Sequence, residues 1–210
     1  LGRVEITDGG SIRFSSTSGV NNGGASAIWD TNTTGGITCR NTATINLGSL
    51  VGSGSVSGSS GATGTGTFVI GGRSEDCTFD GSIVDATAGT RIAAVTKAGT
   101  ATLTLTSATG LTYGGVTNVN EGTLRINGVK SGVGSTTVKT TTTLAGTGSI
   151  AGTTTIQSGG TLAPGNGGIG NLTFSNLTLN TGSKLNLEFG AGNDKATVAS
   201  GSTLNLQSGI

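Results

Sequence analysis

A short acidic segment holds the one cluster of carboxylates in the sequence: Glu75, Asp76, Asp80 and Asp85. Two carboxylates at a suitable separation can hydrolyse a glycosidic bond, and several carboxylate oxygens together can bind Ca²⁺. Arg73 and Arg91 flank the segment and can neutralise its charge. The repeated Gly-Gly-x-Gly-x-Asp motif of calcium-binding solenoids is missing from the sequence. We therefore expect a solvated acidic surface, with no catalytic, cofactor-binding or metal-binding residue.

Cys39 and Cys77 are the only cysteines, and the chain has no His. A zinc site needs more sulfur and nitrogen ligands than these two, and a catalytic thiolate would lack an imidazole base. In an oxidising compartment two such cysteines tend to pair. We therefore predict a disulfide between Cys39 and Cys77, with two separately buried thiols as the alternative.

Aromatic residues offer the remaining groups that can contact a ligand. Trp29 and Tyr113, with the segment 15–36, can touch a sugar or a protein. A lone Trp more commonly covers a hydrophobic end of a domain, so we assign it no binding role.

The composition favours a β-structure outside a cell. Gly accounts for 41 of 210 residues, whereas average proteins contain about 7%. Thr, Val and Ile supply β-branched side chains that suit strands, and no segment shows a helical apolar stripe. The 11 basic and 10 acidic residues are scattered singly, so nucleic-acid binding has no electrostatic footprint. No apolar run is long enough to span a bilayer.

The sequence begins at Leu1 and contains no Met. We therefore expect a processed chain from which a signal peptide has been removed. Low charge and few oxidisable side chains suit an exported protein, located extracellularly or on a bacterial cell surface.

A repeat of about 18–23 residues runs through the second half of the chain. Each repeat contains a Gly-x-x-Leu unit or a close variant, and its leucine opens a short strand in which apolar and polar residues alternate. Short strands of this kind bury their inner faces by stacking on one another. We predict an all-β fold, a parallel β-helix (β-solenoid), with these leucines in one inward column: Leu103, Leu124, Leu144, Leu162, Leu185 and Leu204.

The N-terminal part, residues 1–44, is less regular. Ile12, Leu47 and Phe68 look like further anchors of the repeat, and the long gaps around them predict inserted loops at 15–36 and 71–89. The whole chain, 1–210, is then a single solenoid domain. The alternative is an antiparallel β-sandwich or barrel, with hairpin turns such as Asn127-Gly128 or Asn166-Gly167.

Five sequence segments carry a resemblance to a known family: 79–83 (FDGSI), 95–105 (VTKAGTATLTL), 113–124 (YGGVTNVNEGTL), 144–152 (LAGTGSIAG) and 159–166 (GGTLAPGN). From about Ile45 onward the chain resembles the passenger-associated β-strand repeats of bacterial autotransporter-like surface proteins. The resemblance implies a parallel β-helix exported to the cell surface, and it brings no catalytic residues. Two features depart from the family: no membrane β-barrel follows, and Cys77 stands where such repeats carry a small polar residue.

We therefore expect a non-enzymatic structural solenoid that forms a stalk, fibre or filament segment. The alternative is an adhesin-type passenger domain whose loops bind a surface glycan or a protein ligand on a host or neighbouring surface. A carbohydrate-active β-helix enzyme is a third possibility, which the missing His argues against. Neither residues 4–6 nor residues 204–206 look like a capping repeat. We thus expect head-to-tail self-association or continuation of a longer chain, no nucleic-acid partner, and no membrane span.

Overall fold

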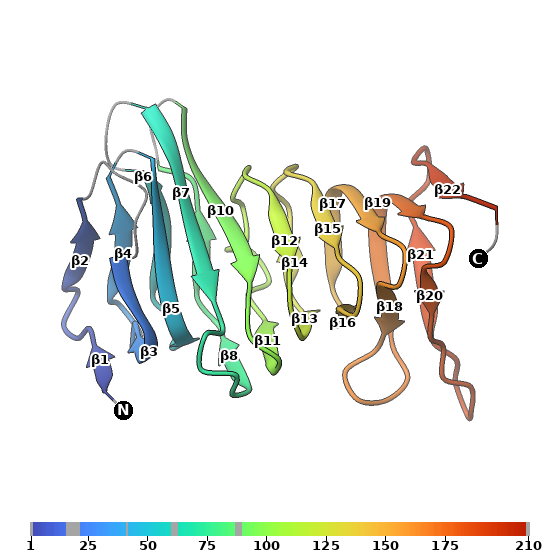
Figure 1. The fold of residues 1–210 in the computed structure, drawn as a ribbon, viewed down its shortest axis with the longest axis horizontal. Coiled ribbons are helices and arrows are strands. Elements are labelled where there is room, and N and C mark those ends of the chain that lie inside the picture. Colours follow the sequence, from blue (N-terminus) through green and yellow to red (C-terminus); the bar gives the residue numbers. More distant parts are fainter. Residues whose placement is uncertain (1, 16–21, 41, 60–62, 87–89, 209–210) are drawn as a thin grey trace.

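The computed structural model describes residues 2–15, 22–40, 42–59, 63–86 and 90–208. Short β-strands joined by turns make up this part of the chain, and none of its elements is a helix that could cross a membrane. Figure 1 shows the strands stacked side by side along the long axis, with the two ends of the chain at opposite ends of the stack. The strands pair in parallel from one turn to the next. The prediction of an all-β, parallel β-solenoid is confirmed.

Each turn of the solenoid contributes to three parallel ladders, which we call A, B and C. Ladder A contains, in stacking order, β3 (Asn22–Asp30), β5 (Ala43–Val51), β7 (Thr63–Ile70), β10 (Thr90–Lys97), β12 (Thr117–Val119), β15 (Thr136–Val138), β17 (Ser149–Ile156), β19 (Asn171–Leu179) and β22 (Leu204–Leu206). Its inward side chains alternate with outward polar ones, as the period of a strand requires.

Ladder B follows ladder A along each turn. It contains β1 (Arg3–Glu5), the ends of β3 and β5, β8 (Cys77–Phe79), β11 (Thr102–Leu105), β13 (Thr123–Ile126), β16 (Thr143–Gly146), β18 (Thr161–Pro164) and β20 (Lys184–Leu185). Several of its strands begin with the Gly-x-x-Leu units of the sequence.

Ladder C closes the turn. It contains β2 (Ser11–Phe14), β4 (Gly36–Cys39), β6 (Ser55–Ser59), β9 (Ser82–Val84), the single residue Leu111, β14 (Val129–Lys130), the starts of β17 and β19, and β21 (Lys195–Val198). The apolar side chains of the three ladders meet in one continuous core.

The expected leucine column lies on ladder B, with one exception. Leu103, Leu124, Leu144, Leu162 and Leu185 follow one another as direct strand partners. The first four are fully buried, whereas Leu185 in the last turn is 41% exposed. Leu204 pairs with Leu177 on ladder A instead, so its assignment to the column is wrong. A chain that makes three strands per turn passes through similar Leu-containing strands on more than one ladder.

The two expected loop insertions contain strands of the solenoid. Strand β3 lies within 15–36, and β8 and β9 lie within 71–89; residues 16–21 and 87–89 are outside the described part. The long gaps arose because the supposed anchors belong to different ladders. Ile12 pairs with Ile37 on ladder C, and Phe68 pairs with Val95 on ladder A. The expectation of loops is thus wrong for the described residues of both segments.

Candidate functional site

The first two carboxylates of the acidic segment, Glu75 and Asp76, bond to different neighbours and do not share a binding site. Glu75 forms an ion pair with Arg73, at 2.7 Å between oxygen and nitrogen. Asp76 accepts a hydrogen bond from the backbone N–H of Thr102 on the next turn, at 2.7 Å. Both side chains therefore stabilise the path of the chain around β8.

The other two carboxylates also connect successive turns. Asp80 accepts a hydrogen bond from the hydroxyl of Thr106. Asp85 accepts one from the N–H of Ala93, at 2.8 Å, and a second from the N–H of Gly114, at 2.9 Å. Within the described residues, no three His, Cys, Asp or Glu side chains come close enough to hold a metal ion. Each carboxylate of the acidic segment therefore has a partner within the chain itself.

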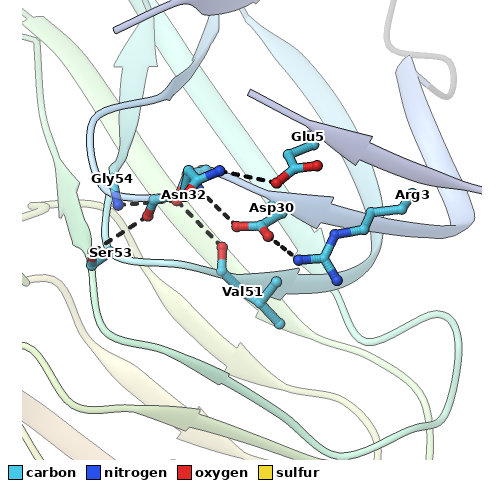
Figure 2. Close-up of polar contacts among 8 residues, drawn as sticks. Arg3, Glu5, Asp30, Asn32, Val51, Ser53 and Gly54 are labelled. Carbon is cyan, nitrogen blue, oxygen red and sulfur yellow. Dashed lines mark hydrogen bonds and ion pairs between the residues drawn. The ribbon is translucent and has the colours of Figure 1, made fainter. Parts of the chain in front are cut away.

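A polar network with the buried Asp30 and Thr31 at its centre joins the first turns at the end of β3 (Figure 2). Asp30 is 6% exposed, forms an ion pair with Arg3, and accepts a 2.7 Å hydrogen bond from the N–H of Asn32. The amide of Asn32 donates to Glu5 at 3.0 Å. Because Asn32 has a φ of 50°, in the left-handed region that Asn tolerates, these bonds fix a sharp corner.

The same corner bonds to the following turn. The N–H and hydroxyl of Ser53 donate to the carbonyl of Asn32, and the N–H of Gly54 donates to the hydroxyl of Thr31 at 3.0 Å. The Thr31 hydroxyl in turn donates to the carbonyl of Val51 at 3.3 Å. Figure 2 shows Arg3, Asp30 and Asn32 joined by these contacts, so the network connects successive turns.

The two cysteines are buried and are not bonded to each other. Cys39 lies in β4 on ladder C, and Cys77 lies in β8 on ladder B, two turns further along. Two turns correspond to about 10 Å along the stack, whereas a disulfide requires Cα atoms within about 7 Å. The prediction of a disulfide is therefore wrong.

Both thiols are poor nucleophiles. Burial raises the pKa of Cys39 to about 11. Burial also raises the pKa of Cys77, although the nearby Lys97 opposes this effect. Because the thiolate is the reactive form, both side chains act as small apolar groups of the core at neutral pH.

Two lysines occupy core positions, which the sequence analysis missed. Lys97 takes the place between Ile70 and Val119 in an inward column of ladder A, and it is 1% exposed. Its ammonium donates to the carbonyls of Ala98 and Gly99, at 2.6 Å each. Burial lowers the pKa of Lys97.

Lys130 likewise occupies an inward core position, on ladder C between Leu111 and Ile150. Its ammonium donates to the carbonyls of Gly132, at 2.8 Å, and Gly134, at 2.9 Å. It also lies 4.9 Å from the centre of the Tyr113 ring, which attracts a cation. Burial lowers the pKa of Lys130 to about 8. The ammonium groups of both buried lysines thus donate hydrogen bonds to backbone carbonyls in the turns that connect one ladder to the next.

Lys130→Met should change how stability depends on pH. The pKa of Lys130 is about 8 in the fold and about 10.4 in an unfolded chain. Between these values the unfolded chain binds a proton that the folded chain does not, so this lysine makes stability rise with pH. Below pH 8 it costs the wild type on the order of 3 kcal/mol. The free energy of unfolding of wild type minus that of the variant should rise from pH 8 to 10.5, measured by urea denaturation.

Subtracting the free energy of unfolding of the variant from that of the wild type isolates the contribution of Lys130, because the other buried groups titrate in both proteins. Lys97 acts in the same direction, whereas Cys39, Cys77 and Tyr113, whose pKa values burial raises, lower stability above about pH 9. The exposed Lys139 supplies the control: Lys139→Met should leave the difference flat. A flat difference for Lys130→Met as well would contradict the expectation.

The aromatic residues belong to the core. Trp29 is 6% exposed, donates to the carbonyl of Gly24 at 3.3 Å, and packs edge-on against Phe14. Tyr113 is fully buried, and its hydroxyl lies 2.8 Å from that of Thr117. Neither ring is available to a sugar or protein.

The described surface has several open depressions. One of about 270 Å³ lies where ladders A and B meet, and its polar lining includes Asn46, Ser74 and Glu121. Another of about 220 Å³ runs over ladder C, beside Val129 and Thr173. The second also includes Lys130, whose ammonium is bonded to the carbonyls of Gly132 and Gly134.

The last turn exposes apolar side chains at positions that are buried in the turn before it. Leu204 and Leu206 are 50% and 59% exposed, although they follow the buried Leu177 and Leu179 in their columns. Leu185 follows the buried Leu162 in the same way. Among the described residues, nothing covers this end of the core, and its last strands have no partner on their outer edge. Such edges invite another strand.

No protein-family model matches the chain, and neither the curated proteins nor the solved structures compared with it include a significant match. The fold and the contacts described above are therefore the basis on which a function can be argued.

Proposed function

We propose that this chain is a non-catalytic structural element, a stalk, fibre or filament segment located outside a bacterial cell. The observation that carries the proposal is the unbroken stacking of three parallel ladders around one apolar core. Each turn hydrogen-bonds to the next along the whole described length, which suits a stiff, elongated spacer. The bacterial, exported setting rests on the resemblance to autotransporter-associated repeats.

The use of polar side chains supports a structural role. Asp30, Asp85, Lys97 and Lys130 are engaged with backbone groups of the chain itself. The carboxylates of the acidic segment are similarly committed to Arg73, Thr102 and Thr106. An enzyme of this fold would instead direct such groups at a shared substrate site.

The exposed last turn supports extension of the stack. A further β-turn that covers Leu185, Leu204 and Leu206 would bury a continuous apolar column. A second copy can supply that turn by head-to-tail contact, which generates an open filament when the rotation does not close. Additional sequence on the same chain is the other source.

Assembly can be tested on the isolated 210-residue chain. Sedimentation velocity at increasing concentration, with electron microscopy, should show linear oligomers or filaments. Leu206→Glu should abolish them because it places a charge on the uncovered core. Val133→Glu is the matched control: Val133 is also an exposed apolar residue, but it lies away from the last turn, so assembly should persist.

A monomer at every concentration would contradict self-assembly. Binding of that monomer to glycans or to a cell surface would then favour the adhesin alternative, and Glu121→Gln in the depression between ladders A and B would test it. Turnover of a polysaccharide would contradict the non-catalytic role.

A further inference from the structure

Of the three Asn–Gly steps in the sequence, 22–23, 127–128 and 166–167, the last two stand in opposite surroundings. Asn166 and Gly167 lie in the loop between β18 and β19, and both are exposed. Gly167 has a φ of 79°, and nothing lies within 4 Å of the place where a side chain would begin. Among the described residues, neither the amide of Asn166 nor the N–H of Gly167 has a hydrogen-bond partner.

The other step is held inside the stack. The N–H groups of Asn127 and Gly128 both donate to the carbonyl of Leu105, at 2.9 and 3.1 Å. The side-chain oxygen of Asn127 accepts a hydrogen bond from the N–H of Thr147 at 3.3 Å. A side-chain carbon at Gly128 would lie 2.1 Å from the carbonyl oxygen of Ser107, so this backbone cannot move without separating two turns.

We propose that Asn166 is a site of spontaneous covalent modification, in which its amide is lost through a cyclic imide. The backbone nitrogen of Gly167 attacks Cγ of Asn166, and a C–N bond forms. The bond from Cγ to Nδ2 breaks, the proton of the Gly167 N–H passes to the departing nitrogen, and ammonia leaves. Water then adds to either carbonyl of the five-membered imide and opens it to aspartate or isoaspartate.

The local geometry predicts that Asn166 reacts faster than Asn127. Attack requires a backbone nitrogen that is not hydrogen-bonded and a chain that can bring this nitrogen onto Cγ. Gly167 meets both conditions, since a residue without Cβ hinders neither the approach nor the required torsions. Gly128 meets neither until its turn opens, and an opening breaks hydrogen bonds of both neighbouring turns.

The modification should leave the solenoid intact. On one side of the loop, Gly165 and Gly146 exchange two backbone hydrogen bonds, each of 2.8 Å. On the other side, the N–H of Gly170 donates to the buried Asp194 at 2.7 Å. These contacts hold the loop ends, so the new carboxylate adds a negative charge at the surface without entering the core.

Mass spectrometry of the aged protein tests this inference. The folded chain is kept in warm, mildly alkaline buffer, and samples taken over time are digested under acidic conditions and sequenced by fragmentation. Asn166 should be modified at least about tenfold faster than Asn127, since the latter must first open its turn. In a parallel sample unfolded in denaturant, the two sites should react at similar rates because both precede Gly.

Asn166→Gln is the control variant, since attack on a longer side chain forms a six-membered ring far more slowly. It should lose the modification of the loop and keep that of Asn127 in the unfolded sample. Equal rates at the two sites in the folded protein would overturn the inference. An unreactive Asn166 in a folded sample whose unfolded counterpart reacts at Asn127 would overturn it too.

Discussion

Leu144→Asp should prevent the isolated chain from folding cooperatively. Leu144 is fully buried in the middle of the ladder B column, between Leu124 and Leu162. Loss of a buried leucine side chain alone costs about 2–5 kcal/mol. An unpaired carboxylate in the same place adds a desolvation penalty of several kcal/mol more, while a typical domain has only about 5–15 kcal/mol to lose.

Leu144→Ala gives a graded version of this experiment. Urea denaturation followed by circular dichroism should show a loss of about 2–5 kcal/mol. Leu185→Ala is the matched control, because Leu185 occupies the same column but is 41% exposed in the last turn. Its replacement should cost less than about 1 kcal/mol. An equal loss in the two variants would contradict the column.

The order of the ladder B strands could be predicted from the sequence for a simple reason. The Thr-Leu units, which follow Gly122, Thr142 and Gly160, place a turn residue, a β-branched residue and a core residue in a fixed order. Thr123-Leu124, Thr143-Leu144 and Thr161-Leu162 therefore pair directly. Ladders A and C carry no repeated motif of this strength, and anchors taken from different ladders gave false gaps at 15–36 and 71–89.

The buried lysines show where residue type misleads. A lysine usually lies at the surface, so residue type alone does not predict a core position for Lys97 or Lys130. Their position was nevertheless available from alignment of repeats. Lys97 stands two residues after Val95, as Val119 stands two residues after Thr117, and these residues are direct strand partners. The free carbonyls at the corner make the charge tolerable.

The disulfide was predicted from the expected compartment, which says nothing about distance. Cys39 and Cys77 lie on different ladders, and turn number, rather than sequence separation, decides how far apart they are. The hydrogen-bond partners of the acidic segment could not be predicted for a related reason. Asp76 and Asp85 accept hydrogen bonds from backbone N–H groups of the following turn, whereas Glu75 pairs with Arg73. These partners follow from the stacking of turns and not from the spacing of the carboxylates in the sequence.

Gly148→Ala should be nearly as damaging as the charge in the core. Gly148 lies between β16 and β17, and a Cβ placed there would be 1.9 Å from the carbonyl oxygen of Gly128 on the preceding turn. The obstacle is backbone, so no side-chain rotation can relieve the clash. The N–H of Gly148 also donates to Ile126, and its carbonyl accepts from Thr173, so shifting the residue strains both adjoining turns.

We expect Gly148→Ala to lower the free energy of unfolding by at least about 3 kcal/mol, as overpacking of a rigid site does. Gly168→Ala is the control, because nothing lies within 4 Å of its added carbon. That variant should stay within about 0.5 kcal/mol of wild type. Similar stability of the two variants, measured by urea denaturation, would show that the turns are not in close contact at this corner.

Hydrogen exchange extends the same test from one corner to the whole stack. In a solenoid each turn contacts only its neighbours, so a local defect first weakens the two interfaces that share it. Amides of β16, β17 and β18 should therefore lose protection before those of β7 and β10 in Gly148→Ala. Uniform loss along the chain would mean that the ladders unfold as one unit, and that the rigidity proposed for the stalk is a property of the complete stack.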